Sequence, residues 1–124
     1  MARLRRPLTV VVTIFFASIT LAACGSSDGL ADARRACVKV ERALAIERAA
    51  DAPGVPSAHQ AQLHAQAMTV VLSATGDAAR ANSSNGSWNA LMTSISQAGQ
   101  VPLIYLEPTL SSQCDEVMRT ASGP

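Results

Sequence analysis

Aromatic residues are scarce in this sequence. Only four of the 124 residues are aromatic, and two of these, Phe15 and Phe16, fall in an apolar run near the start. The rest of the chain must therefore build its core from aliphatic side chains and many alanines. Because small side chains bury little area each, burial alone should give such a domain modest stability.

Catalytic and metal-binding patterns are also missing. The sequence contains no G-x-S-x-G, no H-E-x-x-H and no glycine-rich phosphate loop. Its two histidines, His59 and His64, are five residues apart, which on a helix turns them about 140° away from one another. Asp115 and Glu116 are adjacent and would diverge on a helix. We therefore predict no catalytic residues, no metal site and no bound cofactor, and an enzyme is the least favoured class of function.

Basic charge is lacking once the first residues are set aside. Arg3, Arg5 and Arg6 are three of the ten basic residues and precede the apolar run, whereas none of the nine acidic residues does. After Cys24 the chain has seven basic and nine acidic residues, a formal charge of −2. A nucleic-acid partner requires a basic patch, so we predict none.

The start of the chain has the parts of a secretory signal. A basic opening precedes an apolar run at residues 8–20, which is shorter than the roughly 20 residues of a membrane-spanning helix. The run leads into Leu21-Ala22-Ala23-Cys24, which resembles the lipobox of bacterial lipoproteins. The resemblance implies cleavage before Cys24, a diacylglyceryl lipid on Cys24, and attachment to the extracytoplasmic face of the cell membrane. An uncleaved anchor and a plain secreted protein are the alternatives.

The lipobox resemblance divides the chain into three parts. Residues 1–23 would be a cleaved signal helix, residues 24–29 a lipidated tether and residues 30–121 a helical domain. The five residues after Cys24 reach at most about 18 Å when extended. The domain is therefore expected to stay close to the membrane surface.

With Cys24 carrying lipid, Cys37 and Cys114 are the remaining cysteines. Outside the cytoplasmic membrane such a pair typically forms a disulfide. A reactive thiol would require C-x-x-C spacing or a histidine partner, and the sequence shows neither. We expect a structural bridge that contributes on the order of 4 kcal/mol through loop closure.

Apolar residues recur at helical spacing in four segments, predicted as helices at 30–50, 57–81, 87–99 and 108–120. Connectors rich in proline, glycine or asparagine separate them, at 51–56 and 82–86, and Pro108 is expected to begin the last helix. The inner stripes are predicted to comprise Leu30, Ala33, Cys37, Val40 and Leu44; Leu63, Ala67, Val70, Val71, Ala74 and Ala78; Trp88, Leu91, Met92 and Ile95; and Leu110, Cys114, Val117 and Met118. Because both cysteines are inward, the pattern predicts an all-α antiparallel four-helix bundle with one interhelical disulfide.

Two features of the helical segments admit a functional interpretation. Arg35, Lys39 and Arg42 line up on one side of the first helix, which fits an anion contact, although a solvated face with nearby acids is the favoured interpretation. The stretches Trp88 to Met92 and Val101 to Cys114 resemble small envelope lipoproteins of GC-rich Gram-positive bacteria. That resemblance implies a shared fold and carries no activity.

The sequence therefore predicts a lipid-anchored, non-catalytic helical module that binds another cell-envelope protein. Trp88, Tyr105 and Leu106 are the candidate partner contacts, although for Trp88, in the first turn of an amphipathic helix, core packing is the favoured interpretation. The alternative is a small-molecule or lipid binder with a pocket between helices. The two hypotheses differ in whether the apolar residues at 101–106 lie outside the fold or line a cavity.

Overall fold

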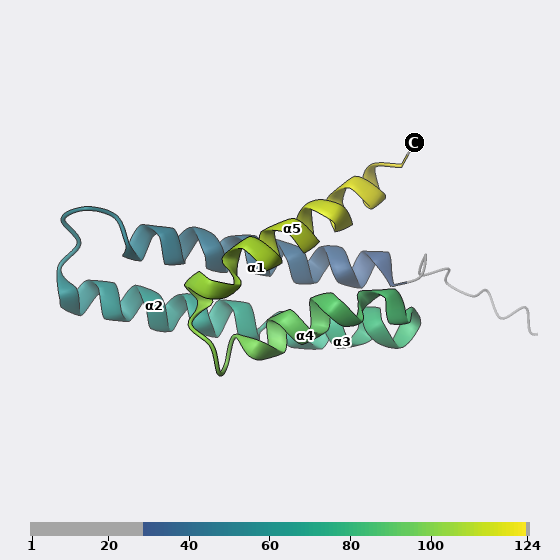
Figure 1. Cartoon of the computed structure of the whole chain (residues 1–124), viewed down its shortest axis with the longest axis horizontal. Helices are drawn as coiled ribbons and strands as arrows, with labels where there is room; N and C mark the ends of the chain where they lie inside the picture. The colour runs from purple at the N-terminus through teal and green to yellow at the C-terminus, as the bar shows by residue number, and fades with distance from the viewer. Residues whose placement is uncertain (1–28, 124) are drawn as a thin grey trace, which may run out of the picture.

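The computed structural model describes residues 29–123, which are helical apart from short connections (Figure 1). The helices are α1 (Leu30–Ala50), α2 (Ser57–Leu72), α3 (Thr75–Ser84), α4 (Asn89–Gln97) and α5 (Leu103–Ser122), with a 3-10 turn at Gly86–Trp88. Strands are absent from this described range, so the prediction of an all-α fold is confirmed. The expectations for the signal helix, for Cys24 and for the tether up to residue 28 lie outside the described residues. Among residues 29–123, no helix has both the length and the apolar character needed to cross a membrane.

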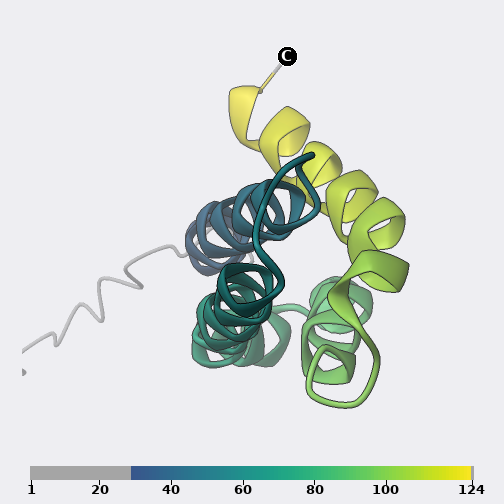
Figure 2. The same cartoon turned by 90° about the vertical axis from the view of Figure 1, so that its left-hand side faces the viewer.

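The four expected helical segments pack together. α1 is central, because it contacts α2, α3 and α5, while α4 packs between α3 and α5. Viewed along the bundle in Figure 2, α4 and the start of α5 lie to one side of α1, α2 and α3, and α5 then runs past α1 toward the C-terminus. In Figure 1, α5 crosses α1 obliquely.

The core is built from aliphatic side chains and alanine, as the scarcity of aromatics requires. Its larger fully buried members are Val40, Leu44, Val71, Ile95, Leu110 and Val117, and nine alanines are buried between the helices. Small residues allow helix axes to come close together. The start of α1 lies very close to α3, because a Cβ atom at Gly29 would be 2.6 Å from the carbonyl oxygen of Ala81. Gly29 also has φ of 76°, which favours glycine at this position.

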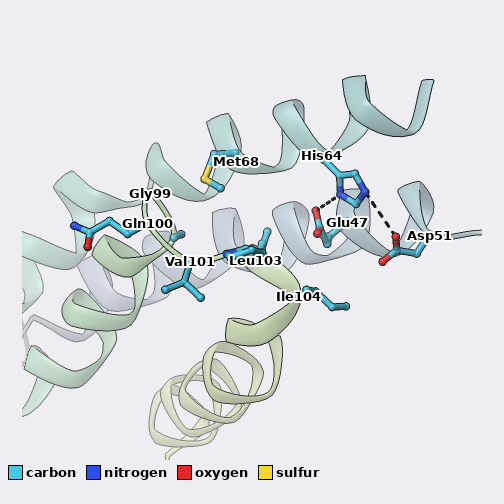
Figure 3. A pocket seen from close by; sticks show the side chains of 11 residues that line it. Glu47, Asp51, His64, Met68, Gly99, Gln100, Val101, Leu103 and Ile104 are labelled. Carbon is cyan, nitrogen blue, oxygen red and sulfur yellow. Dashed lines mark ion pairs between the residues drawn. The ribbon is translucent and has the colours of Figure 1, made fainter. Parts of the chain in front are cut away.

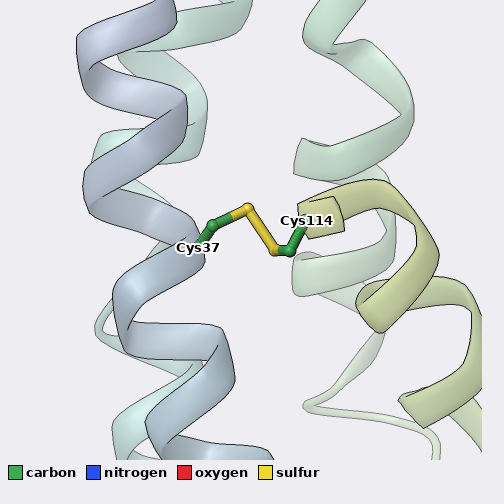
Figure 4. Close-up of a disulfide and its surroundings, with 2 residues drawn as sticks. All are labelled: Cys37 and Cys114. Carbon is green, nitrogen blue, oxygen red and sulfur yellow. A yellow bond between two sulfur atoms is a disulfide. The ribbon is translucent and has the colours of Figure 1, made fainter. Parts of the chain in front are cut away.

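The predicted disulfide is confirmed. Cys37 of α1 and Cys114 of α5 are both buried and bonded, with their Cα atoms 5.3 Å apart (Figure 4). The bridge closes a loop across a sequence separation of 77 residues and joins the first helix to the last. It therefore fixes α5 against α1 in a core of small side chains.

The expected second helix at 57–81 is divided at Ser73 and Ala74 into α2 and α3. The Ser73 hydroxyl donates to the Val70 carbonyl at 2.6 Å, and the Ala74 amide bonds to Val71 rather than to the residue four before it. Lys39 Nζ donates to the Ser73 carbonyl at 3.2 Å. These contacts compete with the regular helical bonds and end α2. The prediction of one continuous helix here was wrong.

The last helix begins five residues earlier than expected, because α5 starts at Leu103 and continues through Pro108. Proline at this position removes one amide, whose helical acceptor would have been the carbonyl of Ile104. Ile104 is exposed, so water can hydrate that carbonyl. The longer helix places Leu103 and Leu106 on the same buried stripe as Leu110. Met118, predicted to be inward, lies on the exposed side.

Candidate functional site

An open pocket lies between α1, α2 and the segment that joins α4 to α5 (Figure 3). Its volume is about 660 Å³. We call it the Glu47 pocket, and its lining consists of Glu47, Asp51, His64, Met68, Ala98, Gly99, Gln100, Val101, Pro102, Leu103 and Ile104. The charged residues lie at one end of the pocket, near the C-terminal end of α1. Apolar residues form most of the rest of the pocket wall.

The polar end is organised around a buried carboxylate. Glu47 is only 5% exposed, because helical spacing places it on the buried stripe of α1 after Val40 and Leu44. His64 of α2 faces it, with Nδ1 at 3.0 Å from Glu47 Oε2. The other ring nitrogen, Nε2, is 3.7 Å from Oδ1 of Asp51, whose side chain is half exposed. The imidazole therefore lies between two carboxylates.

This setting changes the protonation of His64. The hydrogen bond to Glu47 is the main cause that raises the pKa of His64 above 6.5, although desolvation acts in the opposite direction. The negative charges of Glu47 and Asp51 raise the pKa further. A larger fraction of His64 is therefore protonated near neutral pH than for an isolated histidine. Even then, two carboxylates face one imidazolium, so the polar end keeps a negative charge.

The apolar part of the pocket comes from α2, from the segment before α5 and from the start of α5. Met68 forms one side, and Val101 and Leu103 form the other (Figure 3). At its edge Ile104 is 45% exposed, and the adjacent Tyr105 is 74% exposed. The apolar residues of this segment thus line an open pocket and also extend beyond it.

A second charged cluster joins α1 to α3. Asp77 is 3% exposed, and its carboxylate meets Lys39 Nζ at 2.6 Å, Arg35 Nε at 3.6 Å and the guanidinium of Arg80. Asp32 contacts both arginines. Burial alone would raise the pKa of Asp77, but the hydrogen bond from Lys39 and the nearby cations together lower that pKa. Arg35 and Lys39 are thus held by acids, one of which comes from another helix.

The candidate partner contacts have different environments. Tyr105 is exposed and follows the lining residue Ile104 in sequence but is not itself in the lining, whereas Leu106 is buried at 8% exposure on the inner stripe of α5. Trp88 is partly buried against the core and lines a separate hollow of about 460 Å³ with Leu30 and Gln113. None of the three candidate contacts lines the Glu47 pocket, and only Tyr105 among them is fully exposed.

Sequence reasoning missed the polar end of the pocket. Glu47 was not among the predicted inner residues of the first helix, although it follows Val40 and Leu44 at i+7 and i+3. A charged residue at an inner position is a detectable signal, because such a residue needs a partner when it is buried. Across residues 29–123, His, Cys, Asp and Glu form no group of three or more that could hold a metal ion.

Comparisons with protein-family models, with curated proteins and with solved structures found no match to this chain.

Proposed function

We propose that this protein is a lipid-anchored, extracytoplasmic and non-catalytic module that binds an apolar segment of another cell-envelope protein in the Glu47 pocket. One observation carries the proposal. Residues 101–104 line a pocket of about 660 Å³, and Ile104 of this lining and the next residue in sequence, Tyr105, are exposed. That volume lies within the range of roughly 300–1,000 Å³ typical of ligand sites. Exposed tyrosines are enriched at protein interfaces.

The position at the membrane is part of the proposal. It rests on the lipobox resemblance at Leu21 to Cys24 and on the short segment between Cys24 and α1. The antiparallel arrangement of the helices is also part of the proposal. The short connection at 51–56 between α1 and α2 supports it. A domain with a tether of this length would present its pocket to partners in or near the membrane.

The pocket lining favours binding over nucleophilic catalysis. His64 is oriented by Glu47, but no serine, threonine or cysteine is among the residues that line the pocket. A histidine and carboxylate pair needs such a hydroxyl or thiol for acyl transfer. The second candidate function is the capture of a small amphipathic molecule, which the size of the pocket favours.

Site-specific photocrosslinking in intact cells tests the partner. A benzophenone amino acid replaces Tyr105 in one variant and Val38 of α1, which is 60% exposed and outside the pocket, in the control. We expect a discrete protein adduct from position 105 and none from position 38. Adducts that are absent, or equal at the two positions, would contradict the proposal, and a small-molecule adduct would favour the second candidate. Cys24→Ala should move the protein out of the membrane fraction.

A further inference from the structure

We propose that the Glu47 pocket selects a segment with a lysine side chain flanked by apolar residues, whose ammonium group binds between His64 and Asp51. This inference rests on the proposed function and specifies its ligand chemistry. The flanking apolar side chains would pack against Met68, Val101 and Leu103. The charges around the pocket, the hydrogen-bonding capacity of His64 and the apolar character of the lining favour this ligand.

The charges around the pocket favour a cation. Glu47 from α1 and Asp51 just after it are negative, and His64 from α2 is the only basic side chain in the lining. On α5, the first charged residue after the lining is Glu107. Its carboxylate is paired with Arg48 Nη1 at 2.6 Å. The segment between α4 and α5 contributes no charged residue to the lining. A basic ligand therefore complements a site with an excess of negative charge.

The hydrogen bond between His64 and Glu47 leaves Nε2 of neutral His64 as an acceptor for that cation. Because the Glu47 carboxylate can only accept, the hydrogen of neutral His64 is assigned to Nδ1, which lies 3.0 Å from Glu47 Oε2. Nε2 is then an acceptor, 3.7 Å from Asp51 Oδ1, which is also an acceptor. Two acceptors this close together have no donor between them. A lysine ammonium carries three donors and can bond to both.

Protonation of His64 would compete with this ligand. When Nε2 gains a proton it becomes a donor to Asp51, and the imidazolium occupies the site that the ammonium would take. Binding and protonation are therefore reciprocal. A basic segment should bind more tightly as pH rises through the range in which His64 loses its proton.

The apolar lining explains why a free amine is not enough. Met68, Val101 and Leu103 offer aliphatic surface beside the polar end (Figure 3), and burying such surface is favourable in proportion to its area. A lysine in an apolar context supplies both parts, because its methylene stem also packs on apolar surface. A glutamate in the same place would meet two like charges.

The test uses the full chain in detergent micelles and three peptides as probes. These are acetyl-Leu-Lys-Leu-amide, the same peptide with norleucine in the centre, and the same peptide with glutamate. Norleucine keeps the aliphatic stem and removes the charge. At pH 8 we expect the lysine peptide to bind about tenfold more tightly than the norleucine peptide, and the glutamate peptide to bind least. At pH 5.5 the preference for lysine should fall to about threefold or less.

Three variants assign the preference to the site. Glu47→Gln and Asp51→Asn should each reduce the lysine preference at pH 8 by about threefold or more. Asp115→Asn, which makes the same change in net charge on an exposed residue outside the pocket, should leave it unchanged. Asp51 follows the end of α1 and is exposed, so its variant should keep the fold even if the Glu47 variant does not.

Equal binding of the lysine and norleucine peptides at pH 8 would overturn the inference. An equal loss of preference in Asp115→Asn, or no binding of any peptide at millimolar concentration, would also overturn it. The peptide experiment and the crosslinking experiment can fail independently of one another. A crosslinked partner without lysine preference overturns only the ligand chemistry, whereas lysine preference without a crosslinked partner overturns only the proposed protein partner.

Discussion

Two buried carboxylates on different parts of this bundle have unlike surroundings. Asp77 is 3% exposed and Glu47 is 5% exposed, so both are largely removed from water. Asp77 is contacted by two arginines and a lysine, all permanently charged near neutral pH. Within residues 29–123, Glu47 has a single charged partner, His64, whose charge depends on pH. The first carboxylate is fully compensated, and the second is not.

The difference separates a structural ion cluster from a candidate binding site. A buried charge is tolerated when partners and hydrogen bonds replace its lost hydration. Arg35, Lys39 and Arg80 supply these partners to Asp77. The pKa of Asp77 is lowered in spite of its burial. Glu47 opens on a pocket together with Asp51, so its remaining negative charge is available to a ligand. Burial of an acid alone would not have distinguished the two.

Removing the disulfide should have the largest effect and should act unequally on the two regions. The double variant Cys37→Ala and Cys114→Ala is expected to lose about 4 kcal/mol of unfolding free energy, measured by chemical denaturation. The bridge holds α5, which forms one wall of the Glu47 pocket, whereas the Asp77 cluster joins α1 to α3. Hydrogen exchange should therefore accelerate more at the start of α5 than in α3. Equal acceleration would contradict the separation of the two regions.

Matched substitutions of the two carboxylates should differ by more than 1 kcal/mol. Asp77→Asn is expected to lose roughly 2 kcal/mol, less than a fully buried pair, because its cationic partners remain 41–61% exposed. Glu47→Gln should lose less than about 1 kcal/mol at pH 8, since glutamine can still accept from His64. Denaturation of both variants in the same buffer checks this. Similar losses would show that both carboxylates are structural.

The pH dependence of these losses has opposite sign. The pKa of Asp77 is lowered by folding, so its contribution is present above its unfolded pKa and disappears as pH falls through the folded value. The pKa of His64 is raised, so its pairing with Glu47 stabilises the fold fully below 6.5 and is lost as pH rises through the folded value. The cost of Glu47→Gln should therefore be greater at pH 6 than at pH 8. A cost independent of pH would contradict the pairing.

Helical periodicity and the count of cysteines predicted the main framework. The bounds of α1 and the inward position of Cys37 and Cys114 follow from apolar residues at a spacing of three or four. The break at Ser73 was not predicted, because local bonds to Val70 and Val71 act there together with Lys39, a residue 34 positions away in the chain. Pro108 was read as a helix start, since its cost inside a helix depends on whether Ile104 is exposed.

The candidate site was predictable only in part. The inner position of Glu47 can be read from its spacing after Val40 and Leu44. Its partner cannot, because the register between α1 and α2 decides whether His64 lies opposite, and side-chain packing sets that register. For the same reason the meeting of Asp77 with Lys39 was not visible in the sequence.

The protonation of His64 tests the central claim most directly. Its imidazole resonances are followed by NMR against pH, alone and with the lysine peptide at saturation, and His59, outside the pocket lining, serves as the internal control. The free protein should show a His64 pKa above 6.5, and the lysine peptide should lower that pKa while the norleucine peptide does not. A His64 pKa at or below 6.5 in the free protein, or no response to the lysine peptide, would contradict the account.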